Sequence, residues 1–559
     1  MSVPSDPRGV SSQEKISIEE KAYHQSSKEN VDIEAVPSYV EDDPIEFEEK
    51  KDLIRGLEQR HIQMIALAGT IGTGLFLGSG KAIARAGPAG AFIGYTLVGM
   101  LVSCVCISIA ELSALVPLSG AVIRHAEYFF DPALSFAQGW NSIYYTIVSL
   151  PAEITAAAAI IQFWVTINNA IWVTLLGGLL LATNLFFVRV YGELEFSFAA
   201  LKILLIIGLN IMAVVIVAGG GPDHHAYGFQ YWRDPGPWVD YLGIQPASLG
   251  RFCGFWTTFS NAAYAYSGVE GISLAAAETK APRRNIPKAA KRIFWRVLIF
   301  YVISIFMVGL LVPSNDDRLL NSASTAAESP FVIACENAAI PVVPHIVNAV
   351  VLTSAWSSGN SGLLGGSRIL YGLAREGHAP KVFLRVNRYG IPYIAVCGIS
   401  IFLALGYMTC GHSASIVFGW FQDLVSAATF VHWISICLVY LRFYYGCKKQ
   451  GIDRSELPWK GPLQPYAAWT GMISFSIIMI TAGYTVFING EWDSESFVSA
   501  YFNIPLIFVL YFGYKWTKKS KVVPLEELPI RKYIEIARLN PEPPPQPKKG
   551  WRKFNFLWG

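Results

Sequence analysis

Long apolar stretches recur along most of this chain and restrict the folds that it can adopt. A helix that spans a bilayer needs about 20 mostly apolar residues. Such stretches lie near 62–84, 88–116, 134–165, 170–188, 196–219, 253–277, 293–313, 344–372, 391–409, 413–441, 467–488 and 497–516. Membrane β-barrels show instead segments of about ten residues with alternating polarity, a pattern that this sequence lacks. The sequence therefore predicts an all-α membrane protein with about twelve transmembrane helices.

The composition excludes several other classes of protein. Of the 559 residues, 53% are hydrophobic and 15% are charged, whereas soluble domains carry about 25% charged residues. The net charge of +3 provides no strong positive field for binding nucleic acid. The eight cysteines show no CxxC or Cys/His spacing, so neither a metal site nor a disulfide framework is expected.

Both ends of the chain differ from its apolar middle. Residues 1–52 are rich in Ser, Lys and Glu and poor in hydrophobes, which is typical of disorder. Residues 53–516 form the predicted transmembrane domain, and residues 517–559 form a tail that ends in a Pro-rich run. Positive charge gathers in alternate loops, above all in "KAPRRNIPKAAKR" (280–292), while the loop "NGEWDSES" (489–496) has no Lys or Arg. The positive-inside rule then places both tails in the cytosol.

The first apolar stretch contains "GTIGTGLFLGSG" at residues 69–80, in which five of the twelve residues are glycine. In lipid, irregular backbone persists only where protein buries it or where it lines a wet cavity. Close packing of small residues is one explanation, which Gly74 and Gly78 would serve. An unwound helix beside a binding site is the other, and it accounts better for so many glycines with Thr and Ser among them. The spacing fits neither GxGxxG nor a P-loop.

A second interruption lies in the sixth stretch, in "AYAYSGVEGISLAAAE" (263–278), where Gly268 and Gly271 flank Glu270. Interruptions at matching positions of two halves indicate a substrate site between inverted repeats. The spans then divide into five plus five, with broken helices 1 and 6 and two extra helices.

Unwound helices offer groups that suit a zwitterion. Freed N–H groups and the positive end of a half-helix attract an anion, so a carboxylate is expected against Gly72, Thr73 and Gly74. Freed carbonyls in the sixth span, with the phenol of Tyr266 and the hydroxyl of Ser267, are expected to take an ammonium group. An α-amino acid carries both charges at this spacing.

The order of four motifs carries a family resemblance. These motifs are "GTIGTGLFLGSG", "YSGVEG", "ETKAPRRNIPKAAKR" and "SRILYGLAREGHAPK", and the likeness runs from about Leu53 to Tyr511. Together they resemble the fungal amino acid permeases of the amino acid–polyamine–organocation (APC) superfamily, whose fold has two inverted five-helix repeats. The stretches "GLLVPSNDDRLL" and "SPFVIACENAAIPVVPHIVNAVVL" resemble most the dicarboxylic amino acid permease branch.

The resemblance implies an integral, multi-pass protein of the plasma membrane that imports L-amino acids with protons by alternating access. It also implies a ubiquitin-ligase adaptor on the N-terminal tail, where Lys15, Lys21 and Lys28 are the candidate ubiquitin acceptors. Many members of the family end in Phe-Trp-Cys, a candidate lipidation site. This chain ends in Leu557-Trp558-Gly559, so terminal lipidation is not expected.

Four ionisable residues fall inside predicted spans. Placing a charged side chain inside a membrane is energetically costly, so such residues are candidates for a functional role. Glu270 is expected to hold the substrate ammonium or to carry a proton, and capping of freed N–H groups is the alternative. Lys202, in "EFSFAALKILLIIG", resembles the lysine of proton-coupled relatives, which implies a coupling role; snorkelling to the cytosolic surface is the alternative. Glu153 matches a position where the family often has an acid that affects substrate choice. Glu111 is expected to form a gate or a helix contact.

These arguments predict one site between the first and sixth spans, completed by the third, eighth and tenth. The expected substrate-binding residues are Ile71, Gly72, Thr73, Gly74, Glu153, Tyr264, Tyr266, Ser267, Gly268, Glu270 and Asn360. Lys202 and Glu270 are the expected proton-coupling residues.

No catalytic residue, metal or cofactor is expected, because no GxSxG, HExxH or ATP-binding motif occurs. The expected partners are an amino acid, the proton and membrane lipid. Two other functions stay open at this point. One is transport of a related amine such as GABA, choline or a polyamine, and the other is a receptor that binds amino acids without transporting them.

Overall fold

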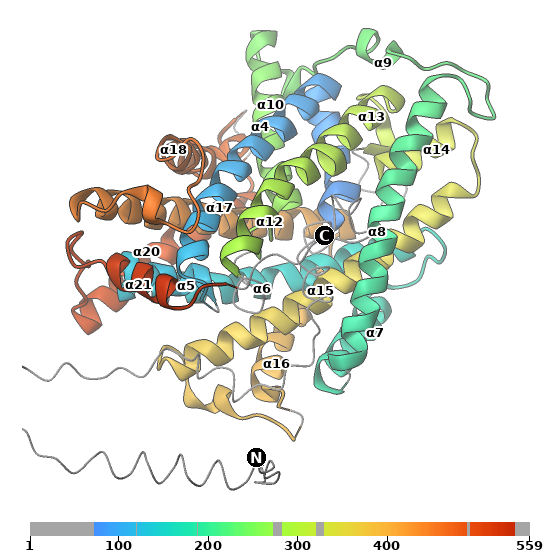
Figure 1. The fold of residues 1–559 in the computed structure, drawn as a ribbon. Coiled ribbons are helices and arrows are strands. Elements are labelled where there is room, and N and C mark those ends of the chain that lie inside the picture. Colours follow the sequence, from blue (N-terminus) through green and yellow to red (C-terminus); the bar gives the residue numbers. More distant parts are fainter. Residues whose placement is uncertain are drawn as a thin grey trace, which may run out of the picture. The chain divides into compact units, whose positions relative to one another are not determined.

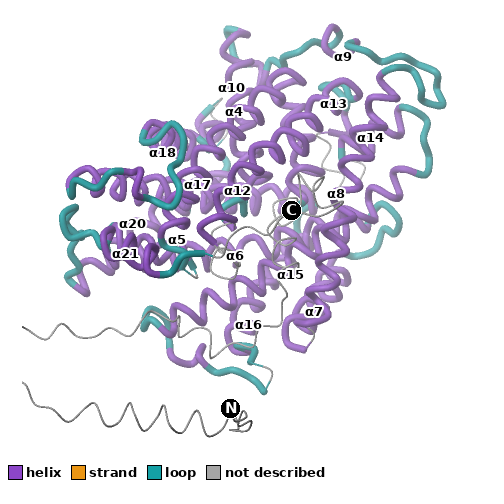
Figure 2. The backbone as a smooth tube through the Cα atoms, viewed as in Figure 1, coloured by secondary structure: helices purple, strands orange, loops and turns teal. Residues whose placement is uncertain are grey.

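The computed structural model describes residues 72–118, 120–186, 188–271, 282–319, 329–388, 390–488 and 492–542. The chain divides into the units Met1–Leu53 and Ile54–Gly559, and all of the described residues belong to the second. Across these ranges every regular element is helical (Figure 2). The expectation of an all-α chain is confirmed for this part of the protein.

Several of the helices are long enough to cross a membrane. Within the described ranges, seven helices have the required length and apolar character, and a pair bent by 43° adds an eighth. They are Gly74–Leu115, Pro132–Ile161, Asn169–Phe186, Leu194–Val217, Tyr393–Cys410, Ala414–Lys449, Tyr466–Phe487 and the pair Ser494–Tyr501 with Asn503–Lys518. The protein is therefore a multi-pass helical membrane protein.

The first of these helices contains the junction between two predicted spans. It begins with the π-helix η1 (Gly74–Gly78) and continues as α4 (Ser79–Leu115). Inside α4, Gly87 has φ 76° and ψ 171°, and Pro88 follows it. A Cβ at Gly87 would lie 2.6 Å from the carbonyl oxygen of Pro237, so this left-handed bend requires glycine. The bend falls between the predicted spans 62–84 and 88–116.

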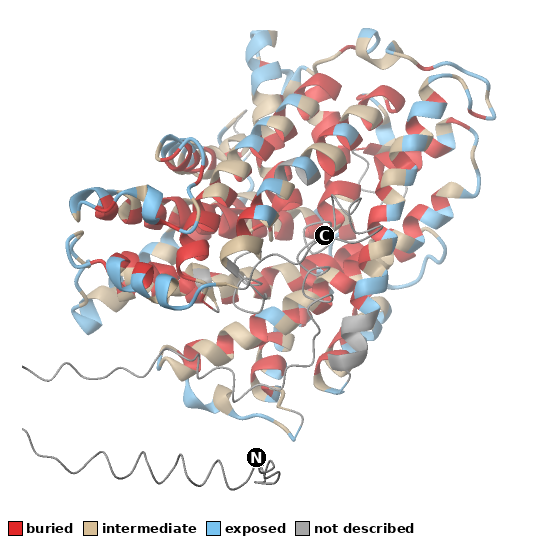
Figure 3. Cartoon of the chain, viewed as in Figure 1, coloured by how far each residue is buried: buried red, intermediate tan, exposed pale blue. Residues whose placement is uncertain are grey.

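Three long helices form the interior of the bundle: α6 (Pro132–Ile161), α15 (Val343–Arg375) and α17 (Ala414–Lys449). The α6 helix packs against both of the others, and Figure 3 shows mostly buried residues along α6 and α17. Asp131 starts α6 by accepting a hydrogen bond from the Leu134 N–H at 2.7 Å, as an N-cap aspartate does.

Peripheral helices present apolar side chains outward. They include α7 (Asn169–Phe186), α8 (Val188–Val217), α18 (Tyr466–Thr481) and α20 (Asn503–Lys518). Their exposed side chains include Leu175, Leu204, Ile211, Ile480 and Val509. An apolar surface of this kind is expected where helices face lipid.

The helix α10 (Ala247–Tyr266) packs along α4 (Figure 1). The remaining elements are α5 (Ala121–Phe129), α9 (Gln230–Arg233), η2 (Tyr241–Gly243), α12 (Pro282–Arg296), η3 (Val297–Val302), α13 (Ile303–Leu311), η4 (Asp317–Leu319), α14 (Pro330–Asn337), η6 (Lys381–Leu384), α16 (Tyr393–Ser400), η7 (Ile401–Cys410), η8 (Arg454–Glu456), η9 (Tyr484–Phe487), α19 (Ser494–Tyr501) and α21 (Ile530–Leu539).

Residues 523–542, which contain α21, pack against the bundle as a C-terminal strap. The N–H of Val523 donates to the carbonyl oxygen of Phe130 at 2.9 Å. At the other end of the strap, Arg283 on α12 donates to the carbonyl oxygen of Asn540 at 2.5 Å. This helix was not predicted from the sequence, because residues 517–559 were expected to form a tail.

Glu111, near the end of α4, is buried in a polar contact rather than in a ligand site. Its carboxylate accepts from Arg454 Nη2 at 2.7 Å, from the Tyr440 hydroxyl at 2.9 Å and from the Gly461 N–H at 2.8 Å. This contact fixes the loop after α17 to the end of α4. Glu111 is thus placed in a helix contact, one of the two roles expected for it.

We expect Glu111→Ala to destabilise the protein. Arg454 would keep a largely buried charge without its carboxylate, and removing one partner of a buried ion pair costs about 3–5 kcal/mol. The melting temperature of the purified protein in detergent measures this effect. The control is Glu456→Ala, which breaks the exposed pair with Arg538 and should cost less than about 1 kcal/mol. Equal melting temperatures of the two variants would contradict the expectation.

Candidate functional site

The predicted interruption of the sixth span is present at its first boundary. The α10 helix ends at Tyr266, and Ser267 has ψ 145°. Gly268 has φ 86°, a conformation that favours glycine. Residues 267–270 form a turn, so the helical hydrogen-bond ladder is broken at this point. Residues 272–281 lie outside the described ranges.

The glycine-rich stretch lies directly against the end of α10. A Cβ at Gly74 would come within 2.7 Å of the Tyr264 ring and 2.8 Å of the Ala265 Cα. Only a residue without a side chain permits this approach, so Gly74 brings the two interrupted segments together. Ile71, the first of the expected site residues, lies outside the described ranges.

Glu153 on α6 lies at the centre of this contact. Its Oε2 accepts from the Thr73 hydroxyl at 3.1 Å, and its Oε1 accepts from the Ser358 hydroxyl on α15 at 3.0 Å. The Tyr264 hydroxyl lies 3.2 Å from the Thr73 hydroxyl. Because a hydroxyl has one proton and Thr73 gives its own to Glu153, Tyr264 is the donor of this bond. A Cβ at Gly72 would lie 3.4 Å from Glu153 Oε1.

Five expected site residues thus lie together, from three separate helices. They are Gly72, Thr73, Gly74, Glu153 and Tyr264. The cluster contains a carboxylate, two hydroxyls and the backbone at the start of η1. It offers acceptors for a cation next to N–H groups for an anion.

Lys202 on α8 is fully buried next to this cluster. Its ammonium donates to the Ser357 hydroxyl at 3.2 Å, and that hydroxyl donates to Glu195 Oε2 at 2.5 Å. Ser357 precedes Ser358 on α15, so adjacent hydroxyls serve Glu195 and Glu153. This placement inside the protein does not fit snorkelling of Lys202 to a surface.

Glu270 lies just after the interruption and contacts α17. Its Oε2 accepts from Trp433 Nε1 at 3.2 Å, and its Oε1 lies 3.9 Å from His432 Nδ1. His432 also contacts the Ser142 hydroxyl on α6 at 3.1 Å through Nε2. These contacts connect Glu270 with α17.

Three expected site residues point elsewhere. The Tyr266 hydroxyl donates to the carbonyl oxygen of Tyr95 at 3.0 Å, so its phenol faces α4. Residues two apart on a helix point in nearly opposite directions, and Tyr264 already faces Thr73. The Ser267 hydroxyl donates to the Tyr264 carbonyl oxygen at 2.7 Å. Asn360 accepts from Asn184 on α7 at 2.7 Å.

Sequence reasoning missed Glu195 and Ser358. A signal for Glu195 was available, because Glu195 and Lys202 are seven residues apart and two helical turns put them on one face. No such pattern marks Ser358, since "TSAWSSGNSGLLGGSR" contains five serines and only packing selects among them.

We expect Gly74→Ala to disturb the contact between η1 and α10. The new methyl would meet backbone at Ala265, which cannot rotate away, and overpacking of this kind costs about 1–3 kcal/mol. A lowered melting temperature in detergent is the readout. Gly178→Ala on α7 is the matched control, since no atom lies within 4 Å of its Cβ position. A Gly74→Ala protein as stable as this control would rule out the close approach.

Known proteins resemble this chain over most of its length. A family model described as amino acid permease matches residues 61–526. The dicarboxylic amino acid permease of Saccharomyces cerevisiae is 35% identical over 88% of this chain and 81% of its own length. The proline-specific permease of Emericella nidulans is 38% identical over 92% of this chain and 94% of its own length. A probable proline-specific permease of Schizosaccharomyces pombe is 41% identical over 80% of this chain and 82% of its own length.

These matches confirm the family resemblance. Because this family consists of transporters, they also confirm the expectation that the chain is not an enzyme. With the interrupted α10 helix and the buried polar cluster beside it, they lead to one conclusion. The chain belongs to the amino acid permease family, whose members are membrane transporters.

Proposed function

We propose that this permease is a proton-coupled symporter that imports L-amino acids across the plasma membrane by alternating access. The observation that carries the proposal is the polar chain from Tyr264 through Thr73, Glu153 and the α15 serines to Lys202. It connects the interrupted substrate segments with a buried group that can bind a proton. Movement of a proton and movement of substrate can therefore depend on the same side chains.

The substrate carboxylate is assigned to the backbone of Ile71, Gly72, Thr73 and Gly74. The start of η1 supports this assignment, because N–H groups at a helix start lack intrahelical partners. The substrate ammonium is assigned to the carbonyl groups freed around Ser267 and Gly268, with Glu153 and Tyr264 close by.

The remaining expected site residues, Tyr266, Asn360 and Glu270, do not bind the substrate directly in this proposal. Tyr266 and Asn360 hold α4 and α7 in position, and Glu270 is kept as a second proton-coupling group beside Trp433. Because Glu270 contacts α17, its protonation would act on the packing between the sixth span and α17.

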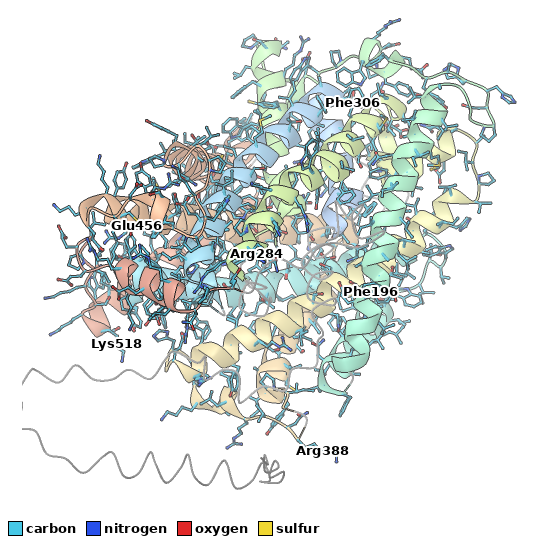
Figure 4. The ribbon with its side chains drawn as sticks, viewed as in Figure 1. Phe196, Arg284, Phe306, Arg388, Glu456 and Lys518 are labelled. Carbon is cyan, nitrogen blue, oxygen red and sulfur yellow. The ribbon has the colours of Figure 1, made fainter. Side chains whose placement is uncertain are left out.

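The proposed topology has twelve spans, with an inverted repeat of five plus five and two extra helices. The bend at Gly87 supports the count, since it divides the 42-residue helix Gly74–Leu115 into two segments. Both termini are assigned to the cytosol. In Figure 4, Arg388 and Lys518 lie at the end of the bundle opposite Phe306. Positive residues gather on the cytosolic side of membrane proteins, so this end of the bundle is assigned to the cytosol. The ubiquitin acceptors proposed at Lys15, Lys21 and Lys28 lie outside the described residues.

The names of the relatives leave the carried amino acid open. They include permeases named for dicarboxylic amino acids, proline and lysine. Transport of a related amine and binding without transport are the competing functions, and the first experiment separates all three.

We expect cells that lack their own permeases but express this chain to accumulate radiolabelled amino acid above the external concentration. A protonophore should abolish the accumulation, because a proton gradient drives it. Competition by each of the twenty amino acids, GABA, choline and a polyamine identifies the substrate class. Saturable binding without accumulation would indicate a receptor, and accumulation that resists the protonophore would exclude proton symport.

We expect Lys202→Met to separate exchange from accumulation. Methionine fills a similar volume but cannot bind a proton, so the variant should lose at least tenfold in gradient-driven uptake and lose its pH dependence. Counterflow exchange of labelled for unlabelled substrate requires no net proton movement and should persist. Unchanged pH dependence of uptake would remove Lys202 from the coupling mechanism.

A further inference from the structure

Glu195 is a buried carboxylate that the substrate site does not require. It lies on α8, it is fully buried, and its Oε2 accepts from Ser357 at 2.5 Å. Its Oε1 has no hydrogen-bond partner among the described residues. A buried carboxylate with an unsatisfied oxygen is costly, so packing alone does not explain the presence of a glutamate here.

Glu195 and Lys202 lie at different depths along α8. The two residues are seven apart, which corresponds to about 10 Å along the helix axis. In the proposed topology α8 runs from the cytosol outward, so Glu195 lies between Lys202 and the cytosolic end of the span. Ser357 lies between the two charges, since it accepts from Lys202 and donates to Glu195.

We propose that Glu195 takes the proton from Lys202 and releases it toward the cytosol. The Lys202 ammonium gives one proton to Ser357 Oγ while the Ser357 hydroxyl gives its own proton to Glu195 Oε2. Lys202 becomes a neutral amine, Glu195 becomes a carboxylic acid, and Ser357 still carries one proton. Glu195 then loses the proton to water and is a carboxylate again, so one proton has left Lys202 for the cytosol.

The charges around the relay agree with this direction. Two carboxylates act electrostatically on Lys202: Glu195, seven residues before it on α8, and Glu153 of the substrate cluster on α6. The helices packed on α8 are α15, α13 and α7. In the described contacts α15 presents Ser357 to Lys202 and Glu195, and α13 presents Ser304 to Asn210. The Asn184 side chain of α7 donates to Asn360 on α15. Lys202 is thus near two carboxylates, one beside the substrate segments and, in the proposed topology, one toward the cytosol.

The inference rests on the proposed symport, and the experiment tests the two separately. Purified protein is reconstituted into liposomes with an inward proton gradient, and both accumulation and counterflow exchange of the identified amino acid are measured. Accumulation by the wild type tests symport itself. If the wild type does not respond to the gradient, symport fails and the relay fails with it.

With a responding wild type, we expect Glu195→Gln to lose at least tenfold in accumulation and to keep counterflow within about twofold. Ser357→Ala removes the bridging hydroxyl and should show the same loss, and the double variant should be no worse than either single one. Glu195→Asp keeps a carboxylate, so it should restore part of the accumulation with a shifted pH profile. Glu495→Gln, an exposed glutamate on α19, is the matched control and should behave like the wild type.

Wild-type accumulation by Glu195→Gln or by Ser357→Ala would overturn the relay while leaving symport intact. A parallel loss of accumulation and counterflow in both variants would also overturn it, because that result indicates a structural role only. If Glu195→Gln does not fold, Ser357→Ala decides by the same two outcomes.

Discussion

Buried carboxylates connect the helices of this permease, and the packing of the other helices depends on these contacts. A carboxylate inside a membrane protein must be hydrogen bonded or paired. Glu153 therefore fixes α6 against η1 and α15, and Glu195 fixes α8 against α15. Glu111 does the same between α4 and the loop after α17. Each contact joins segments that lie far apart in the sequence, so a change of charge at one carboxylate changes how these segments pack.

The sequence allowed good prediction of features that depend on local chemistry. Apolar length predicted the helical, multi-pass character, and the boundary expected between the stretches 62–84 and 88–116 falls at the bend at Gly87. The end of α10 at Tyr266 followed from the glycines after it, since a helix loses stability where glycines gather. A site between the first and sixth spans was expected as well, because paired interruptions have a known spatial meaning in transporters.

Features that depend on the rotation of one helix against another could not be predicted. Tyr264 and Tyr266 are both tyrosines near a helix end, but only Tyr264 faces Thr73, and the packing of α4 determines which one does. Asn360 was expected at the site and instead contacts Asn184. The link between Glu195 and Lys202 passes through Ser357, a residue more than 150 positions away, which no local pattern specifies.

The C-terminal strap has a practical consequence for handling the protein. Leu528 lies against Gly446 so closely that a Cβ there would be 2.5 Å from its side chain, and Phe129 is completely covered in the same region. A reporter fused beyond residue 542 leaves these surfaces covered. A shortened chain that stops before residue 523 exposes these surfaces to water, and exposed apolar surface promotes aggregation. Purification tags therefore belong after the strap, and deletions should leave the strap intact.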